Sequence, residues 1–256
     1  MSQEKRVELI KQLLEEKQEL TTRDIMSEFG GVSQDTARRD IVLLSRRGEV
    51  KRTHGGILPL DFGNKVPNFQ SRLSRFTKQK TKIALEAANY FQAHHVYFVD
   101  ASTILLKTCQ NINLPMTIIT HSLDNCTALA EENKVTVKVL SGTLDHQNRF
   151  FYSTAAISEL DNIALDTAFI AASGIDEHGI YLLNQEDAEI VGKAVERARR
   201  VILVAEHHKF INNSYYSICS PPEKISVFIT DKVLSERERA IFPESTKIQL
   251  AGGELD

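Results

Sequence analysis

Nine residues near the start of the chain, VSQDTARRD (Val32 to Asp40), decide the fold of its first part. Ser33 is a good residue to begin a helix, because its hydroxyl can accept a hydrogen bond from a free backbone amide of the first turn. Small and apolar residues then recur at a helical spacing and form one stripe: Ala37, Ile41 and Leu44. Arg39 and Arg46 fall roughly opposite. The stretch therefore predicts a helix with one packed face and one face that carries arginines.

The stretches on either side complete a small unit. Before it, Thr22 can begin a short helix, and Gly30 and Gly31 provide the turn into Ser33. Further upstream, an amphipathic helix is indicated by Val7, Ile10, Leu13 and Leu14. After it, Gly48 ends the helix, and EVKRTHGG (49–56) predicts a short strand and a tight turn. Three helices followed by a basic ribbon predict a winged helix-turn-helix.

Positive charge is concentrated in one region of the 256-residue chain. The net charge is −3, yet residues 33–82 carry 12 Lys or Arg against four Asp or Glu, a local charge of +8 that leaves −11 elsewhere. This distribution favours one basic nucleic-acid-binding face and one acidic globular domain. The region ends in a basic cluster, Arg72, Arg75, Lys78, Lys80 and Lys82. These side chains either hold DNA phosphates or only solvate the linker.

The N-terminal region resembles a known family. The matching positions are Val32, Ser33, Thr36, Arg38, Arg39 and Asp40, followed by Gly48, Arg52, His54, Gly55 and Gly56. These residue types at fixed offsets over about 25 positions are similar to the signature of the DeoR family of bacterial sugar-metabolism regulators. The resemblance implies that the helix after Ser33 enters the major groove of double-stranded operator DNA.

The resemblance implies eight candidates for DNA contact: Ser33, Gln34, Asp35, Thr36, Arg38, Arg39, Arg52 and His54. Arginine can bind a phosphate or read guanine with two hydrogen bonds, and glutamine can read adenine. The alternative is a merely solvated helix face, on which Arg38 or Arg39 pairs with Asp35 or Asp40. The order of cap, turn, arginine pair and wing favours the DNA interpretation.

The domain boundary is predicted between about residues 57 and 75. That stretch lacks a sustained apolar period until its end and is interrupted by Pro59, Gly63 and Pro67. The prediction is a DNA-binding domain at 1–56, a linker at 57–75 and a second domain at 76–256.

In the second domain, β-rich apolar runs alternate with helical stretches. Strands are predicted at 96–100, 116–120, 135–140, 167–172, 201–205 and 227–230. Helices are predicted between them, at 102–110, 122–132, 153–161, 186–199 and 235–240. Apolar strands separated by helices predict an α/β domain with a largely parallel sheet covered on both faces. In such sheets ligands bind outside the carboxyl ends of the strands.

Polar residues near these strand ends are the candidates for binding an effector: Asp100, Ser102, Thr103, Thr120, Ser122, Gly174, Asp176 and Lys209. Hydroxyls and free amides at helix N-termini suit a phosphate, and Lys209 adds a positive charge. Asp100 or Asp176 can accept hydrogen bonds from sugar hydroxyls. The alternative for each residue is an ordinary helix cap, turn residue or surface lysine.

The resemblance to the DeoR family extends through this domain, where DTAFIAASGID (166–176) and VILVAEHHKF (201–210) are similar to the family's patterns. It implies a fold like ribose-5-phosphate isomerase and glucosamine-6-phosphate deaminase that senses a sugar phosphate. The family usually has Asp-x-Gly-Thr-Thr after the first strand, where this chain has Asp100, Ala101, Ser102, Thr103 and Ile104. Glu206 and Val191 stand where the family has aspartate and lysine. These differences predict a phosphate pocket that is retuned or partly lost.

No metal site or cofactor is predicted. Adjacent histidines, as in His94-His95 and His207-His208, point to opposite faces of a strand and lack a third ligand at a suitable spacing, so they are interpreted as loop or surface residues. The three cysteines are too few and too scattered for a disulfide framework. No apolar run approaches the roughly 18 residues needed to cross a bilayer. The expectation is a reduced, cytoplasmic protein without a membrane partner.

Three hypotheses of function follow. The first is a transcription regulator, a repressor by expectation, that binds DNA as a homo-oligomer, dimer or tetramer, and is controlled by a phosphorylated sugar. The second is an isomerase or deaminase acting on a sugar phosphate, with Asp100, Asp176 and Lys209 as acid, base and phosphate anchor. The third is a regulator whose sensor has lost phosphosugar binding. A catalytic domain has no need of a basic winged helix, which favours regulation over catalysis.

Overall fold

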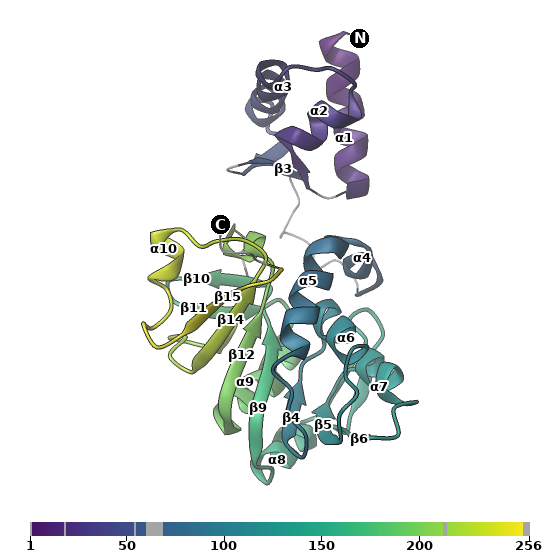
Figure 1. Ribbon diagram of the computed structural model, residues 1–256, viewed down its shortest axis with the longest axis vertical. Helices are drawn as coiled ribbons and strands as arrows, with labels where there is room; N and C mark the ends of the chain where they lie inside the picture. Colours follow the sequence, from purple (N-terminus) through teal and green to yellow (C-terminus); the bar gives the residue numbers. More distant parts are fainter. Residues whose placement is uncertain (1, 18, 54, 60–68, 212–213, 253–256) are drawn as a thin grey trace. The chain divides into compact units, whose positions relative to one another are not determined.

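A computed structural model describes residues 2–17, 19–53, 55–59, 69–211 and 214–252 (Figure 1). The chain divides into two compact units, Met1–Val66 with Ser74–Phe76, and Pro67–Leu73 with Thr77–Asp256.

The N-terminal unit packs three helices on a small sheet. The helices are α1 (Gln3–Lys17), α2 (Thr22–Glu28) and α3 (Gln34–Arg46). The strands are β1 (Leu20–Thr21), β2 (Val50–Arg52) and β3 (Gly56–Pro59), which form an antiparallel sheet in the order β1-β3-β2. The core unites the predicted stripe of α3 with Val7, Ile10 and Leu14 of α1. The predicted winged helix-turn-helix is therefore present.

The start of α2 differs from the prediction by one residue. Thr21, not Thr22, caps the helix, because its hydroxyl accepts a hydrogen bond from the backbone amide of Asp24 at 3.1 Å. The Asp24 carboxylate accepts the Thr21 amide in return at 2.8 Å, which completes a capping box. The turn into α3 is made as predicted by Gly30 and Gly31, whose φ angles of +45° and +95° suit glycine.

The second unit is built on a seven-stranded parallel sheet in the order β15-β14-β12-β9-β4-β5-β6. Its strands are β4 (Val96–Val99), β5 (Met116–Thr120), β6 (Val135–Val139), β9 (Leu165–Ala171), β12 (Ala198–Val204), β14 (Ile225–Thr230) and β15 (Lys247–Leu250). The predicted α/β class with a largely parallel sheet is confirmed. Six strands fall where apolar runs predicted them, and β15, with its half-buried residues, was not predicted.

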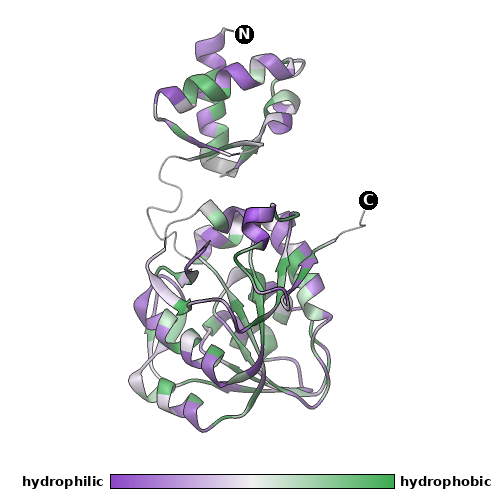
Figure 2. Cartoon of the chain, turned by 90° about the vertical axis from the view of Figure 1, so that its left-hand side faces the viewer, coloured by the Kyte–Doolittle hydropathy of each residue, from purple (hydrophilic) through white to green (hydrophobic). Residues whose placement is uncertain are grey.

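Helices cover both faces of this sheet. The helices of this unit are α4 (Phe69–Ser74), α5 (Thr77–Ala88), α6 (Thr103–Cys109), α7 (Leu123–Leu129), α8 (Thr154–Asp161), α9 (Gln185–Arg197), α10 (Glu236–Arg239) and the 3-10 helix η1 (His207–Ile211). Successive strand residues point to opposite faces, so Val99 packs in a core with α5, α6 and α7, whereas Phe98 packs in a second core with α8 and α9. Figure 2 shows the apolar residues gathered in the central strands.

Two antiparallel additions were not predicted. A hairpin joins β7 (Thr143–Asp145) to β8 (Phe150–Tyr152), and a three-stranded sheet contains β10 (Gly174–Asp176), β11 (Gly179–Leu182) and β13 (Tyr216–Cys219) in that order. Strands of three or four residues are too short for an alternating pattern to stand out in the sequence. In addition, β3 runs on to Pro59, and α4 lies inside the range predicted as linker, where Phe69 is buried.

Candidate nucleic-acid interface and effector site

The helix α3 presents the predicted polar face to solvent. Ser33 caps it, with its hydroxyl accepting a hydrogen bond from the Thr36 amide at 3.2 Å. Ala37, Ile41 and Leu44 are buried, whereas Gln34, Asp35, Arg38 and Arg39 are exposed. Thr36 is half-buried, and its hydroxyl lies 2.9 Å from that of Ser33. The helical spacing of the sequence thus determines the exposed polar face of α3.

Asp40 is buried on the opposite side of the helix and holds α3 against α1. Its carboxylate accepts hydrogen bonds from Arg6 Nε at 2.5 Å, from Arg6 Nη2 at 3.1 Å and from Gln3 Nε2 at 3.0 Å. The carboxylate hydrogen bond raises the pKa of the Arg6 guanidinium. These contacts contradict the alternative interpretation, in which Asp40 pairs with Arg38 or Arg39. Within the described ranges, no ion pair of these two arginines with Asp35 is found either.

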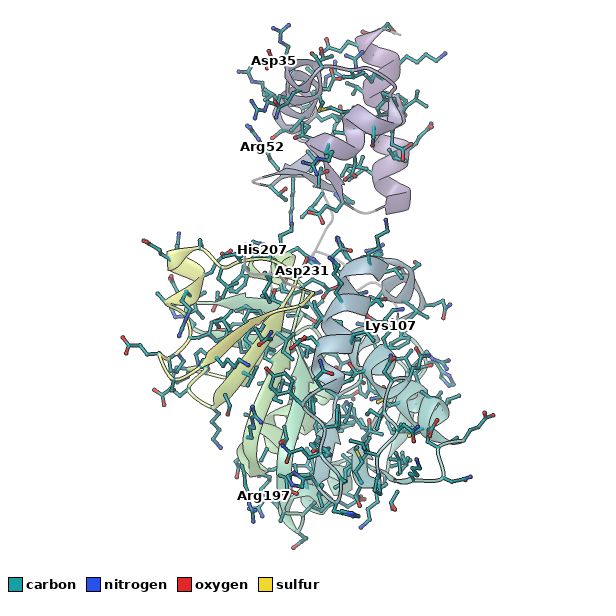
Figure 3. The ribbon with its side chains drawn as sticks, viewed as in Figure 1. Asp35, Arg52, Lys107, Arg197, His207 and Asp231 are labelled. Atoms are coloured by element: carbon teal, nitrogen blue, oxygen red, sulfur yellow. The ribbon has the colours of Figure 1, made fainter. Side chains whose placement is uncertain are left out.

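Two hollows flank the exposed arginines. One, of about 650 Å³, is lined by residues of α2, α3 and the wing, including Gln34, Arg38 and Arg52. The other, of about 560 Å³, is lined by Gln3 of α1 and by residues of α3 that include Asp35, Arg38 and Arg39. Figure 3 shows Asp35 and Arg52 on the same side of this unit. The predicted contact His54 lies outside the described residues.

In the second unit, Asp100 follows the carboxyl end of β4, where the order of the parallel strands reverses: β5 and β6 lie on one side of β4, and β9 lies on the other. The carboxylate is 1% exposed, and its Oδ2 atom accepts the backbone amide of Ala171 at 2.9 Å. Burial raises the pKa of Asp100 to about 7, and the negative charge of Asp187 adds to this shift. Asp100 is thus placed where ligands bind in parallel α/β sheets.

His121, at the end of the neighbouring strand β5, faces the same place. It is completely buried, and its Nε2 atom lies 2.7 Å from Asp187 Oδ1 and 3.8 Å from Asp100 Oδ1. Asp187 comes from the first turn of α9, which Asn184 caps by accepting the Asp187 amide at 2.9 Å. Three ionisable side chains from distant parts of the sequence therefore meet in one cluster.

Positively charged groups lie at the same end of the sheet. Lys80, only 4% exposed, donates to the backbone oxygen of Arg72 and lies 3.8 Å from the Glu206 carboxylate. Burial alone would raise the pKa of Glu206, but the charges of Lys209, His208 and Lys80 together hold it at about 2. Burial lowers the pKa of His208 well below its usual value, and the positive charges of Lys209, Lys80 and Lys232 act in the same direction.

The half-buried Arg72 belongs to this set. Burial lowers the pKa of its guanidinium, and the charges of Asp187, Asp100, Asp145 and Glu206 act against that shift. An arginine remains protonated at neutral pH despite such a shift. The carboxyl end of the sheet therefore combines carboxylates that accept hydrogen bonds with cations that suit an anion.

Comparison with known proteins identifies the domain type of each unit. A family model described as the DeoR C terminal sensor domain matches residues 75–232, and one described as a DeoR-like helix-turn-helix domain matches residues 6–61. The chain belongs to the DeoR family. It is 32% identical over 234 residues to the HTH-type transcriptional repressor GlcR of Bacillus subtilis (strain 168), covering 91% of this chain and 90% of that protein. It is 26% identical to the regulator IolR of the same strain, covering 83% and 85%.

Among solved structures, a D-ribose-5-phosphate isomerase in complex with phospho-erythronic acid aligns with a TM-score of 0.40 at 12% identity, over 52% of this chain and 54% of that one. Within the part of the chain that the structure describes, every helix is too short or too polar to span a bilayer.

Several hydroxyls predicted to bind the effector of this DeoR-family chain have roles within the fold. Ser102 caps α6 by accepting the Leu105 amide, and Ser122 caps α7 by accepting the Asn125 amide. Thr120 Oγ1 donates to the Val99 carbonyl at 2.6 Å and accepts the Ser122 amide at 3.1 Å. Thr103 is buried in the first turn of α6. These contacts match the alternative interpretation, in which the residues are helix caps and turn residues.

Gly174 and Asp176 are placed differently from the prediction. They do not end a strand of the large sheet but form part of β10 in the small antiparallel sheet. Asp176 is exposed, and its Oδ1 atom accepts the backbone amides of His178 and Gly179 in the hairpin turn. Lys209, by contrast, lies in η1, close enough to the buried Glu206 for its positive charge to lower the pKa of that carboxyl group.

Sequence reasoning missed four residues of this region: His121, Asp187, Arg72 and Lys80. His121 follows the predicted strand 116–120 directly and lies between two residues that were chosen, so its position was an available signal. Lys80 was assigned to a linker surface or to DNA phosphates, and its burial beside Glu206 contradicts both roles. His208 is also buried, not a loop or surface residue as predicted.

Proposed function

We propose that this DeoR-family protein is a transcriptional repressor of carbohydrate-metabolism genes that binds operator DNA through α3 and the wing. The observation that carries the proposal is the exposed arginine face of α3, with Arg38 lining both hollows. A buried ion pair holds the helix from behind, so the arginines extend from a rigid element. The name of the relative GlcR, a repressor, and its match over nine tenths of both chains support the regulatory direction.

We further propose that the second unit binds a phosphorylated sugar at the carboxyl end of its sheet. Lys209 and Arg72 supply positive charge for a phosphate, and the Asp100 carboxylate can accept a sugar hydroxyl. Half-buried cations beside buried carboxylates suit a ligand that carries both an anionic group and hydroxyls. Helix-turn-helix regulators usually read paired half-sites, so we also propose a dimer or a tetramer.

The DNA proposal is tested with the full chain and a duplex selected from a random pool. Removing a side chain that binds a phosphate should reduce the slope of log affinity against log salt by about 1, and removing one that reads a base should cost about 1–3 kcal/mol. We expect Arg38→Ala and Arg39→Ala to weaken binding in this way. Lys5→Ala is the matched control, because Lys5 is exposed on α1 and lines neither hollow. Equal affinities for the double arginine variant and the control would refute the proposed interface.

The effector proposal is tested by thermal unfolding with phosphorylated sugars and their unphosphorylated forms. A ligand at 100 times its dissociation constant adds about 2.7 kcal/mol to the native state. The shift should disappear in Lys209→Met and persist in Lys134→Met, since Lys134 precedes β6 at the opposite end of the sheet. The same phosphosugar should release the selected duplex. No shift with any phosphosugar would refute this part, and turnover of one would favour an enzyme.

A further inference from the structure

The cluster formed by Asp100, His121 and Asp187 has the composition and spacing of a metal site. One ligand atom from each residue can be chosen so that all lie within 4.8 Å of one another. The strands β4 and β5 are parallel neighbours, so the residues that follow them emerge at the same end of the sheet. Asp187 reaches the same place from the first turn of α9. Three separate elements therefore fix the three side chains.

A second observation points to a missing partner. Asp100 is 1% exposed, and while its Oδ2 atom accepts the Ala171 amide, its Oδ1 atom has no hydrogen-bond partner among the described residues. Oδ1 is the carboxylate atom that lies 3.8 Å from His121 Nε2. A buried carboxylate oxygen without a partner is costly, and such atoms usually mark a bound ion, water or ligand.

We propose that Asp100, His121 and Asp187 bind a divalent transition-metal ion through Asp100 Oδ1, His121 Nε2 and Asp187 Oδ1. Two ligands about 2.0–2.1 Å from a tetrahedral ion lie roughly 3.3 Å apart. The distances of 2.7 Å and 3.8 Å from His121 Nε2 to the two carboxylate oxygens lie on either side of that value, so small side-chain movements suffice.

The donor set selects the class of ion. One imidazole nitrogen with two carboxylate oxygens suits Zn²⁺, Mn²⁺ or Fe²⁺, whereas Mg²⁺ and Ca²⁺ prefer ligands that are all oxygen. Binding replaces the hydrogen bond between His121 Nε2 and Asp187 Oδ1, because the neutral ring must present the Nε2 lone pair to the ion and carry its one proton on Nδ1. Three protein ligands leave at least one coordination position for water or for an oxygen of another ligand. The site shares Asp100 with the proposed effector site, but it goes beyond the proposed function, because metal binding alone requires neither DNA nor a sugar phosphate.

The test titrates the full, chelator-treated chain with Mn²⁺ and Co²⁺. We expect one ion per chain by calorimetry, a raised unfolding temperature, and Co²⁺ absorption bands without thiolate charge transfer, which excludes the three cysteines as ligands. His121→Gln and Asp187→Asn should weaken binding at least 100-fold. Circular dichroism checks that both variants fold, and Asp187→Asn is the safer of the two because its side chain is 14% exposed.

The matched control is His178→Gln, which removes an exposed histidine that lies 3.9 Å from Glu177. It should leave ion binding unchanged. The proposal is overturned if neither ion binds at about 100 times the protein concentration, or if the folded Asp187→Asn variant binds as tightly as the wild type. Stabilisation by a sugar phosphate with no response to metal would likewise overturn the metal site while supporting the effector site.

Discussion

The buried ion pair between Arg6 and Asp40 should decide whether the DNA-binding unit stays folded. Asp40→Asn replaces a fully buried carboxylate with a neutral amide whose NH₂ group faces the N–H donors of Arg6. Two charge-assisted hydrogen bonds disappear or weaken, and Arg6, 8% exposed, is left without its counter-charge. Breaking a buried pair on one side typically costs about 3–5 kcal/mol. Since Arg6 keeps 8% of its surface in contact with solvent, we expect the lower end of that range, about 3 kcal/mol.

That destabilisation is large for a unit of this size. At about 0.05–0.15 kcal/mol per residue, a segment spanning residues 1–66 has only about 3–10 kcal/mol of stability. The substitution should therefore unfold the N-terminal unit at moderate urea concentration while the sensor stays folded. We expect this unfolding to remove the proposed operator binding, although no residue of the exposed polar face of α3 is changed.

The chain offers a clean assay for this separation. It has no tryptophan, and its six tyrosines, the first of which is Tyr90, all lie in the second unit. Tyrosine fluorescence thus reports the sensor alone, whereas circular dichroism at 222 nm reports helices of both units. In Asp40→Asn the first circular dichroism transition should move to lower urea with the fluorescence midpoint unchanged. Asp35→Asn, exposed on the same helix, is the control and should cost less than about 1 kcal/mol. Equal shifts for the two variants would refute the reasoning.

Two further predictions concern stability. Glu206→Gln leaves the buried Lys80 ammonium without its carboxylate and should destabilise the sensor by about 2–4 kcal/mol, measured by tyrosine fluorescence in urea. Replacing Lys80 by methionine in the same variant should remove this loss of stability. The pKa of Glu206 is lowered to about 2 in the fold, so ionised Glu206 stabilises the folded sensor fully above the ordinary pKa of 4.5, and this stabilisation is lost as the pH falls toward 2. The Gln variant should lack this acid-dependent loss of stability. Identical pH profiles for the variant and the wild type would contradict the assignment. Ser33→Ala removes the cap of α3 and should cost about 1 kcal/mol by circular dichroism in urea, with Ser33→Asp restoring most of it; no loss in the alanine variant would show that the cap is not stabilising.

Local sequence signals predicted the elements whose cause is local. Ser33 can cap a helix with its own hydroxyl, and MTIIT at 116–120 is a strand because β-branched residues crowd a helix and pack well on a sheet. The boundary at Thr21 was missed by one residue because a second threonine follows it, and only the reciprocal bond from Asp24 separates the two.

The charged cluster at the sheet end has a long-range cause. His121 and Asp187 are separated by 66 positions, and Lys80 and Glu206 by 126, so no spacing in the sequence links either pair. Their meeting depends on the strand order, in which β4 lies between β5 and β9. Polar residues after strands were taken as the place to search, but at the end of β5 the hydroxyls of Thr120 and Ser122 were chosen and His121 between them was not.

Ile104, which stands where the family pattern has a threonine, affects how a phosphate can be bound at this end of the sheet. Where the family pattern has a hydroxyl, Ile104 is 2% exposed and packs in the core with α5, and the Ser102 side chain accepts the Leu105 amide. The start of α6 in this chain therefore offers fewer free hydroxyls than the family pattern implies. If a phosphate binds at this sheet end, side-chain cations must supply more of its binding energy, which makes Arg72 and Lys209 the substitutions that discriminate. Loss of phosphosugar binding on replacing Ser102 alone, with both cations intact, would contradict this argument.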